Sequence, residues 1–123
     1  MIGFACVAKF PYYDIKTHSN KHKARPVLII GKSDCSDYVC LPISRVTKSE
    51  YIHTIYDVQI TPEKTPLLSL KQTSYIRTHK QAIINSANLT KRIIHFQSEY
   101  PDIYCEVLNK VELFQNSIFM PHY

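Results

Sequence analysis

The sequence predicts one mainly β domain, a small curved barrel of short strands with short helical turns and a C-terminal amphipathic α-helix. Apolar and β-branched runs fill the first two-thirds of the chain and are interrupted by prolines and polar turns. The period of the apolar residues then becomes helical near the C-terminus. No helical pattern separates the early strands, which disfavours parallel βαβ folds. The 123 residues have the size of a single domain, 1–123, large enough to bury a core.

The first strands are predicted from apolar runs and their breaks. Residues 4–10 form a strand that ends at Pro11, and residues 16–23 form a polar loop with no apolar member. Residues 25–31 are rich in Val, Leu and Ile, which is typical of a strand buried on both faces. Residues 38–43 return as its partner, which predicts an antiparallel pair.

Shorter elements follow. Residues 52–60 alternate apolar and polar side chains, which predicts a strand. Further predicted elements are short strands at 67–70, 73–78 and 90–96, and a turn of helix over 80–84 that Thr78 caps.

The last segment has helical periodicity. Ser98 is the expected cap, and Pro101 lies in the first turn, where its missing N–H is harmless. The apolar stripe consists of Ile103, Tyr104, Val107, Leu108, Val111 and Phe114.

The charge balance favours an anionic partner. Fifteen basic and ten acidic residues give a net charge of +5, which suits a nucleic acid, although a solvated basic surface is an equally weighted alternative. With only two glycines, Gly-rich phosphate loops are excluded. No nucleophile elbow, zinc-protease or dinucleotide-binding motif is present.

Cysteines and carboxylates indicate neither a metal site nor a cofactor. No CxxC pair occurs, and the carboxylates are scattered. Cys6, Cys40 and Cys105 lie in apolar runs, so we expect core thiols in a reducing cytoplasm. The opening apolar stretch lacks a basic leader and ends at Lys9, which predicts no signal peptide, and no run is long enough for a membrane span.

Three places carry candidate chemistry. Arg25 follows the polar loop at the start of a buried strand, where its planar guanidinium suits phosphate oxygens, the alternative being a strand-end salt bridge. Pro42 indicates a strand edge or a bulge. Ser44 lies two residues later, just beyond the predicted strand end, where its hydroxyl either donates to an anion or begins a turn. Arg77 is equally an anion contact or part of a structural ion pair.

In these places the chain resembles the MazF/PemK (Kid) family of toxin endoribonucleases. The matching pieces occur in family order and cover nearly the whole chain. They are Phe10–Asp14, Lys23–Ile30 with its Arg-Pro-Val-Leu block, Leu41–Ser44, Tyr56–Ile60, Ile76–Gln81 and the terminal helix.

The resemblance implies an SH3-like barrel of the CcdB/MazF type, usually a homodimer, and metal-independent, sequence-specific cleavage of single-stranded RNA in the cytoplasm. It also implies a cognate antitoxin that blocks the RNA groove with an extended segment. Arg25 takes the position of the family's catalytic arginine, and Ser44 that of its catalytic threonine. Ser74 stands where some members have an acidic residue, and Gly3-Phe4 replaces the usual Gly-Asp opening.

This family chemistry predicts roles for further residues. In such a reaction the ribose 2′-OH attacks the adjacent phosphorus, leaving a 2′,3′-cyclic phosphate and a 5′-OH. Arg25 would stabilise the charged transition state, Ser44 would donate a hydrogen bond, and His22 would transfer a proton, with His18 as the alternative. Basic and polar side chains would bind the RNA and tyrosines would stack on bases; these are Lys16, Lys21, Lys23, Arg77, Ser74, Tyr12 and Tyr13.

Two alternatives belong to other functional classes. One is a non-catalytic small-barrel module that binds RNA or protein. The other is a gyrase poison of the CcdB type, which relies on aromatic residues near the C-terminus. Trp is absent from this chain, so that role would fall to Phe119 and Tyr123.

Overall fold

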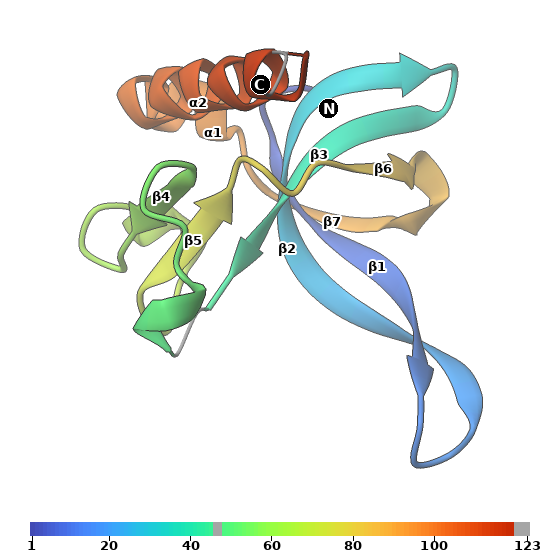
Figure 1. Ribbon diagram of the computed structural model, residues 1–123. Coiled ribbons are helices and arrows are strands. Elements are labelled where there is room, and N and C mark those ends of the chain that lie inside the picture. The colour runs from blue at the N-terminus through green and yellow to red at the C-terminus, as the bar shows by residue number, and fades with distance from the viewer. Residues whose placement is uncertain (46–47, 120–123) are drawn as a thin grey trace.

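The computed structural model describes residues 1–45 and 48–119. Within them the chain forms a curled, wholly antiparallel sheet in the order β4-β5-β3-β2-β1-β7, with β6 paired to β3 (Figure 1). The strands are β1 (Ala5–Asp14), β2 (Ser19–Asp34), β3 (Asp37–Ser44), β4 (Asp57–Ile60), β5 (Ser74–Arg77), β6 (Ala82–Asn85) and β7 (Leu89–Ile94). The predicted mainly β architecture without parallel crossovers is therefore confirmed.

The first two strands extend beyond the body of the molecule as a two-stranded ribbon (Figure 1). The sequence predicted that β1 ends at Pro11 and that 16–23 is a loop; both predictions are wrong. Pro11 pairs with His22, and β2 already begins at Ser19. Within the ribbon, β1 beyond Ala8 and β2 before Val27 pair only with each other in the described residues. A proline is tolerated there because its missing N–H removes no bond to a third strand.

The third strand changes partners halfway along. Asp37–Cys40 pair with β6, whereas Ile43 and Ser44 pair with β5. Pro42 lies between the two partners, where its missing N–H breaks no bond to either one, and this explains why a proline is accepted. On its other side β3 follows β2 only as far as the Val27–Pro42 pair. The edge of β2 from Pro26 back toward Ser19 is consequently open.

Each face of the curled sheet carries an apolar cluster. The larger one joins Leu28, Leu41 and Ile76 to the helices, where Phe96 and Val107 are fully buried. The smaller cluster, on the other face, contains among others Cys6, Val27, Ile29, Cys40 and Ile84. Burying side chains of this size stabilises the fold by about 1.5–3 kcal/mol each.

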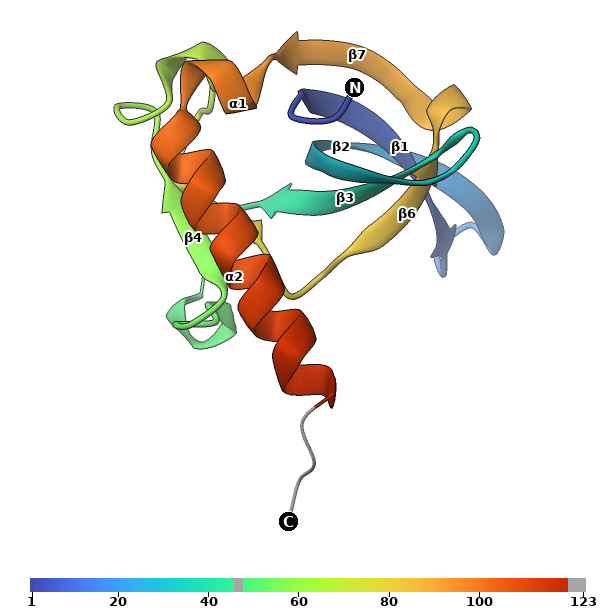
Figure 2. The ribbon, with the colours of Figure 1, turned by 90° about the horizontal axis from the view of Figure 1, so that it is seen from above.

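Two helices close the fold. α1 (Phe96–Glu99) leads into α2 (Pro101–Phe119), which runs across the sheet beside β4 (Figure 2). Pro101 is the first residue of α2, as predicted, and Tyr104, Val107 and Val111 are its buried face. Ser98 does not cap the helix, because α1 begins before it.

Cys105 is exposed rather than part of the core. Within the predicted stripe Leu108 also remains 38% exposed. Leu108 lies at the margin of the helical face that Tyr104, Val107 and Val111 bury, and Cys105 follows Tyr104 directly, which turns it away from that face.

The middle of the chain differs from the sequence prediction in three places. Residues 52–56 are not part of a strand, because the backbone closes a turn between His53 and Asp57. Residues 67–70 do not form a strand, since Pro66 begins the 3₁₀ helix η2 (Pro66–Leu68). The segment 80–84 is not helical, because Ala82–Asn85 pair with the first half of β3.

Candidate functional site

An open groove of about 780 Å³ lies where β2, the end of β3 and the segment before β5 face one another. Its shape follows from the partner change in β3, which leaves the edge of β2 uncovered at residues 23–26. Val7, Pro26, Ile43, Leu68 and Leu70 form the apolar part of the lining. The groove is thus an open continuation of the larger apolar cluster.

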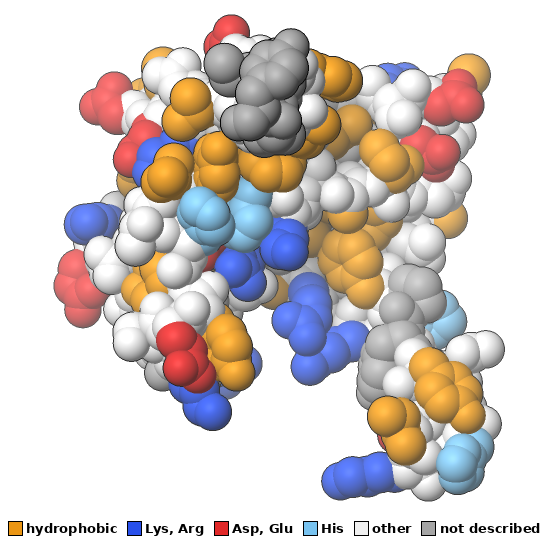
Figure 3. Space-filling view, in the orientation of Figure 1, with side chains coloured by type: hydrophobic (Ala, Val, Ile, Leu, Met, Phe, Trp, Pro, Cys, Tyr) orange, Lys and Arg blue, Asp and Glu red, His pale blue; other side chains and the backbone are white. Residues whose placement is uncertain are grey.

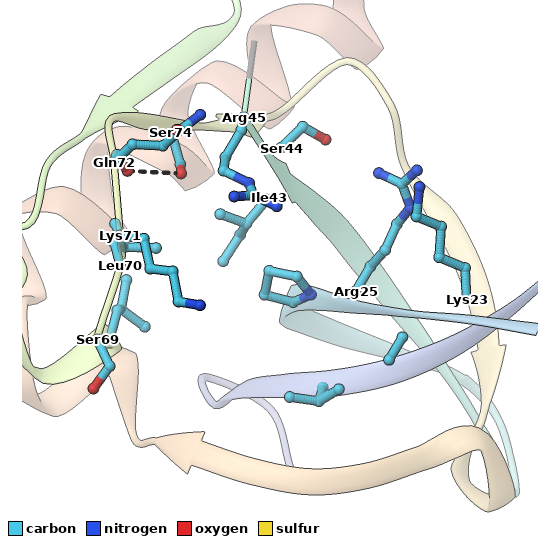
Figure 4. A pocket seen from close by; sticks show the side chains of 14 residues that line it. Lys23, Arg25, Ile43, Ser44, Arg45, Ser69, Leu70, Lys71, Gln72 and Ser74 are labelled. Carbon is cyan, nitrogen blue, oxygen red and sulfur yellow. Dashed lines mark hydrogen bonds between the residues drawn. The ribbon is translucent and has the colours of Figure 1, made fainter. Parts of the chain in front are cut away.

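One wall of the groove is β2. Lys23 and Arg25 are two residues apart on this strand, so their side chains leave the same face about 7 Å apart. Figure 4 shows both extending away from the strand in the same direction. Arg25 pairs with Ala8 of β1 across the ribbon, which fixes its backbone at the point where the ribbon meets the barrel.

The back of the groove is the end of β3. Ser44 pairs with Tyr75 of β5, which holds the half-buried serine at the strand end. Arg45 follows directly, and its side chain extends into the groove between the two walls (Figure 4). The structure therefore brings Arg25 and Ser44, from two different strands, to one groove.

The opposite wall is the segment between η2 and β5. It contributes Ser69, Lys71 and Gln72, and Lys71 projects from it toward the gap (Figure 4). Ser69 ends η2 in a left-handed conformation with φ of 55°, which turns the chain toward the groove. This wall is anchored by Leu68, which is 7% exposed, and by Leu67 N, which donates to the Tyr100 hydroxyl at 3.0 Å.

Ser74 also lines the groove, as the first residue of β5. It is only 2% exposed, and its hydroxyl donates to the Gln72 carbonyl oxygen at 3.2 Å. The hydroxyl proton is therefore already used in shaping the wall that carries Gln72.

The groove is strongly basic. Among the described residues that line it, Lys23, Arg25, Arg45 and Lys71 are cationic, and there is no carboxylate and no imidazole. Figure 3 shows Lys and Arg side chains gathered in the hollow between the β4–β5 side and the projecting ribbon. Such a site attracts an anion and offers N–H donors to its oxygens.

Other predicted residues lie on the ribbon, outside the groove lining. His22 is exposed and pairs with Pro11, and its spacing of three from Arg25 puts the two side chains on opposite faces of β2. Lys21 forms an ion pair with Asp14 at 3.2 Å. Tyr13 is 57% exposed, and its hydroxyl lies 3.4 Å from Nδ1 of His18.

Lys16 lies in the exposed turn at the tip of the ribbon. The side chain of Tyr12 and the whole of Tyr123 lie outside the described part of the chain. Phe119, at the end of α2, is 83% exposed.

Arg77 is held away from the groove in a structural ion pair. Its Nε lies 3.1 Å from Oδ1 of Asp57, whose side chain is fully buried, and its Nη2 donates to the Tyr51 carbonyl oxygen at 3.0 Å. Of the two roles that the sequence left open for Arg77, the geometry supplies the partners for the structural one.

Sequence reasoning did not select Arg45 or Lys71. Arg45 follows Ser44 directly, and that adjacency was an available signal. No sequence signal pointed to Lys71, because its position depends on η2, where the sequence predicted a strand instead.

No cluster of three or more His, Cys, Asp or Glu side chains that could hold a metal ion occurs within residues 1–45 and 48–119. In the same ranges, no helix has the length and apolar character that a membrane crossing requires.

Comparison with known proteins identifies the fold. No protein-family model matches the chain, and no curated protein matches its sequence. Among solved structures, the Mycobacterium tuberculosis toxin MazF-mt6 is similar, with a TM-score of 0.56 and 18% identity, over 89% of this chain and 96% of that chain. The chain therefore has the fold of MazF-type toxins, which confirms the fold class predicted from the sequence.

Proposed function

We propose that this protein is the toxin of a toxin–antitoxin pair and a metal-independent endoribonuclease that cleaves single-stranded RNA. One observation carries the proposal: Arg25 and Ser44, the residues that matched the family's catalytic positions, line one basic groove. The MazF-type fold supports the same assignment, since the similar structure is that of a toxin.

The chemistry assigned to Arg25 is stabilisation of developing negative charge. When the 2′-oxygen attacks phosphorus, charge accumulates on the non-bridging oxygens of the phosphorane. The backbone of Arg25 is held by its pairing with Ala8 of β1, which keeps the guanidinium at the groove where that charge develops. Loss of one such donor typically costs about 3 kcal/mol, or 100-fold or more in rate. Arg25 has no carboxylate partner among the described residues, so its charge is available to the substrate.

Ser44 donates its hydroxyl hydrogen to the same phosphate, and Arg45 adds a second guanidinium beside it. The groove lining contains no carboxylate and no imidazole in the described residues, so we assign the loss of the 2′-OH proton to hydroxide or water from solvent. His22 is given no part in this step because it faces away from Arg25. Replacement of His22 by Ala is accordingly expected to leave the cleavage rate unchanged.

The same proposal includes the partners. The substrate is a single-stranded RNA in the cytoplasm, the inhibitor is a cognate antitoxin that occupies the groove, and the toxin acts as a homodimer. Size-exclusion chromatography with light scattering tests the dimer. Co-purification with the product of a neighbouring short acidic reading frame tests the antitoxin.

Cleavage of a long single-stranded RNA in excess EDTA tests the proposed activity. The wild-type protein should cut at defined sites, whereas Arg25→Ala should cut at least about 100-fold more slowly. Lys32→Ala is the matched control, because Lys32 is an exposed cation on the same strand outside the groove.

Two outcomes would contradict the proposal. Undiminished cleavage by Arg25→Ala would remove the guanidinium from the mechanism. Binding of RNA by the wild-type protein without any cleavage would favour the non-catalytic binding module instead.

A further inference from the structure

Cleavage by the 2′-OH needs a proton donor as well as charge stabilisation, and the groove limits where that donor can lie. The 2′-oxygen enters and the 5′-oxygen leaves on opposite sides of phosphorus, in line. The leaving oxygen departs as an alkoxide, which is a strong base and needs a proton as the P–O bond breaks. The donor must therefore stand across the phosphate from the attacking ribose oxygen.

Few side chains of the groove can release a proton. Among the described lining residues the acidic N–H groups belong to two ammonium and two guanidinium side chains, and guanidinium does not deprotonate in proteins. The remaining donors are Lys23 and Lys71. Lys23 leaves the same face of β2 as Arg25, whereas Lys71 comes from the facing wall (Figure 4).

We infer that Lys71 is a further catalytic residue, the general acid that protonates the 5′-oxygen; this inference rests on the endoribonuclease function proposed above. The segment that carries Lys71 is anchored to the rest of the fold. The two residues before Ser69 are fixed, Leu68 in the core and Leu67 by the hydrogen bond to Tyr100. The left-handed Ser69 then directs the chain so that Lys71 faces the gap.

The step balances as follows. The bond between the 2′-oxygen and phosphorus forms while the bond between phosphorus and the 5′-oxygen breaks, and the electron pair of that bond stays on the 5′-oxygen. The 2′-OH proton passes to solvent hydroxide or water. One ammonium proton of Lys71 passes to the 5′-oxygen, and the resulting neutral amine takes a proton back from solvent before the next turnover.

The test replaces the leaving atom. After a cut site has been mapped, two RNA oligonucleotides are made that differ only in the bridging atom at the cut, oxygen in one and sulfur in the other. A thiolate leaves without protonation, so the sulfur substrate does not need the acid. Single-turnover rates are measured on both substrates for wild type, Lys71→Ala, Lys71→Arg, Lys23→Ala and the control Lys32→Ala.

We expect Lys71→Ala to slow cleavage of the oxygen substrate by about 100-fold or more and to leave the sulfur substrate at the wild-type rate. Lys71→Arg should behave like Lys71→Ala, although it keeps the positive charge, because an arginine does not supply the proton. This pair of variants separates acid catalysis from attraction of the RNA.

Three results would overturn an assignment. Equal losses on both substrates would give Lys71 a binding or electrostatic role only. A loss rescued by sulfur in Lys23→Ala instead would move the acid to the β2 wall. If the wild-type protein cleaves neither substrate nor any longer RNA, the proposed function itself fails, irrespective of Lys71.

Discussion

Two arginines of this chain have opposite surroundings, and the difference decides what each can do. Arg25 is exposed at the groove, without a carboxylate partner in the described residues. The Arg77 side chain donates two hydrogen bonds, one from Nε to the Asp57 carboxylate and one from Nη2 to the Tyr51 carbonyl oxygen. A guanidinium already neutralised by a buried carboxylate has little to offer a phosphate, so the two residues should respond differently to mutation.

Replacing Arg77 by Ala should destabilise the fold by about 3 kcal/mol, because the buried Asp57 carboxylate loses its partner. The variant that remains folded should cleave RNA at close to the wild-type single-turnover rate. Urea unfolding measures the first effect, and cleavage at a temperature where the variant is folded measures the second. A stable Arg77→Ala protein with a large loss of cleavage would instead indicate an RNA contact.

His79 provides a pH-dependent contribution to stability. Its Nδ1 is buried, has no hydrogen-bond partner within residues 1–45 and 48–119, and lies 3.8 Å from Oδ1 of Asp57. Burial lowers the pKa of the imidazole below its ordinary value of 6.5, and the effect outweighs the Asp57 carboxylate, which raises it; Arg77, His53 and Lys80 lower it further.

Because the native pKa of His79 is lower, the unfolded chain binds the proton first as pH falls through 6.5. The free energy of unfolding should therefore decrease below pH 6.5, until the folded state also binds the proton. Urea unfolding at pH 7.5 and 5.5 should show a smaller decrease for His79→Phe than for wild type. An equal decrease in both proteins would assign the pH dependence to other groups.

At the scale of elements, the groove depends on how a short 3₁₀ turn is tied to the helices. η2 holds the wall that carries Lys71, and it is joined to the helical segment by the hydrogen bond that Leu67 N donates to the Tyr100 hydroxyl. The ring of Tyr100 also packs on Phe96, with 5.4 Å between ring centroids. The position of a candidate catalytic residue thus depends on a hydrogen bond between residues that are 33 positions apart in the chain.

Tyr100→Phe removes this hydrogen bond and keeps the ring. The free energy of unfolding should fall by about 1 kcal/mol, and the cleavage rate at saturating RNA should fall because Lys71 is less well fixed. Tyr104→Phe, which removes a hydroxyl from the buried face of the same helical region, is the control and should keep the rate. An unchanged rate in Tyr100→Phe would mean that η2 is held by other contacts.

Strong local signals predicted elements well, and weak ones failed for identifiable reasons. Val27, Leu28 and Ile29 formed the expected buried strand, and the helical spacing of Val107 and Val111 formed α2. The ribbon was missed because residues 16–23 carry no apolar side chain, so nothing in the local pattern marks β2 before Arg25, and because Pro11 indicated a strand end although it pairs with His22. β6 was missed because its conformation is imposed by the first half of β3, which no local pattern reports.

For the candidate site, the sequence located Arg25, Ser44, Lys23 and Ser74, which all line the groove. Each lies in or beside a strand whose apolar pattern is clear. It did not locate Lys71, whose place depends on a non-repetitive segment. It gave weight to His22 because residues 16–23 were predicted as a loop; His22 lies instead in β2, where a spacing of three from Arg25 puts the two side chains on opposite faces.

At the scale of the whole molecule, the chain has a net charge of +5, and four of its fifteen basic residues line the groove. The four cations in the groove lie in one hollow, while Lys21 and Lys110 are paired with carboxylates elsewhere. A single strand that contacts this groove should displace counterions from several phosphates on binding.

RNA affinity should therefore fall steeply with salt. With the four groove cations engaged, a plot of log affinity against log salt concentration should have a slope of roughly −3, at about −0.7 per phosphate contact of a single strand. The measurement uses an uncleavable 2′-deoxy oligonucleotide at increasing KCl concentration. Arg25→Ala should reduce the slope by about one contact, and Lys32→Ala should not change it; equal slopes for wild type and Arg25→Ala would place the bound strand outside the groove.

The most direct test of the central claim is the fate of one ribose hydroxyl. An RNA oligonucleotide with a mapped cut site is compared, in excess EDTA, with the same oligonucleotide carrying a single 2′-deoxy nucleotide immediately 5′ of the scissile phosphate. We predict that the first is cut to a 2′,3′-cyclic phosphate and a 5′-OH end, and that the second is not cut at that position. Cleavage of the 2′-deoxy substrate at that position would contradict the account.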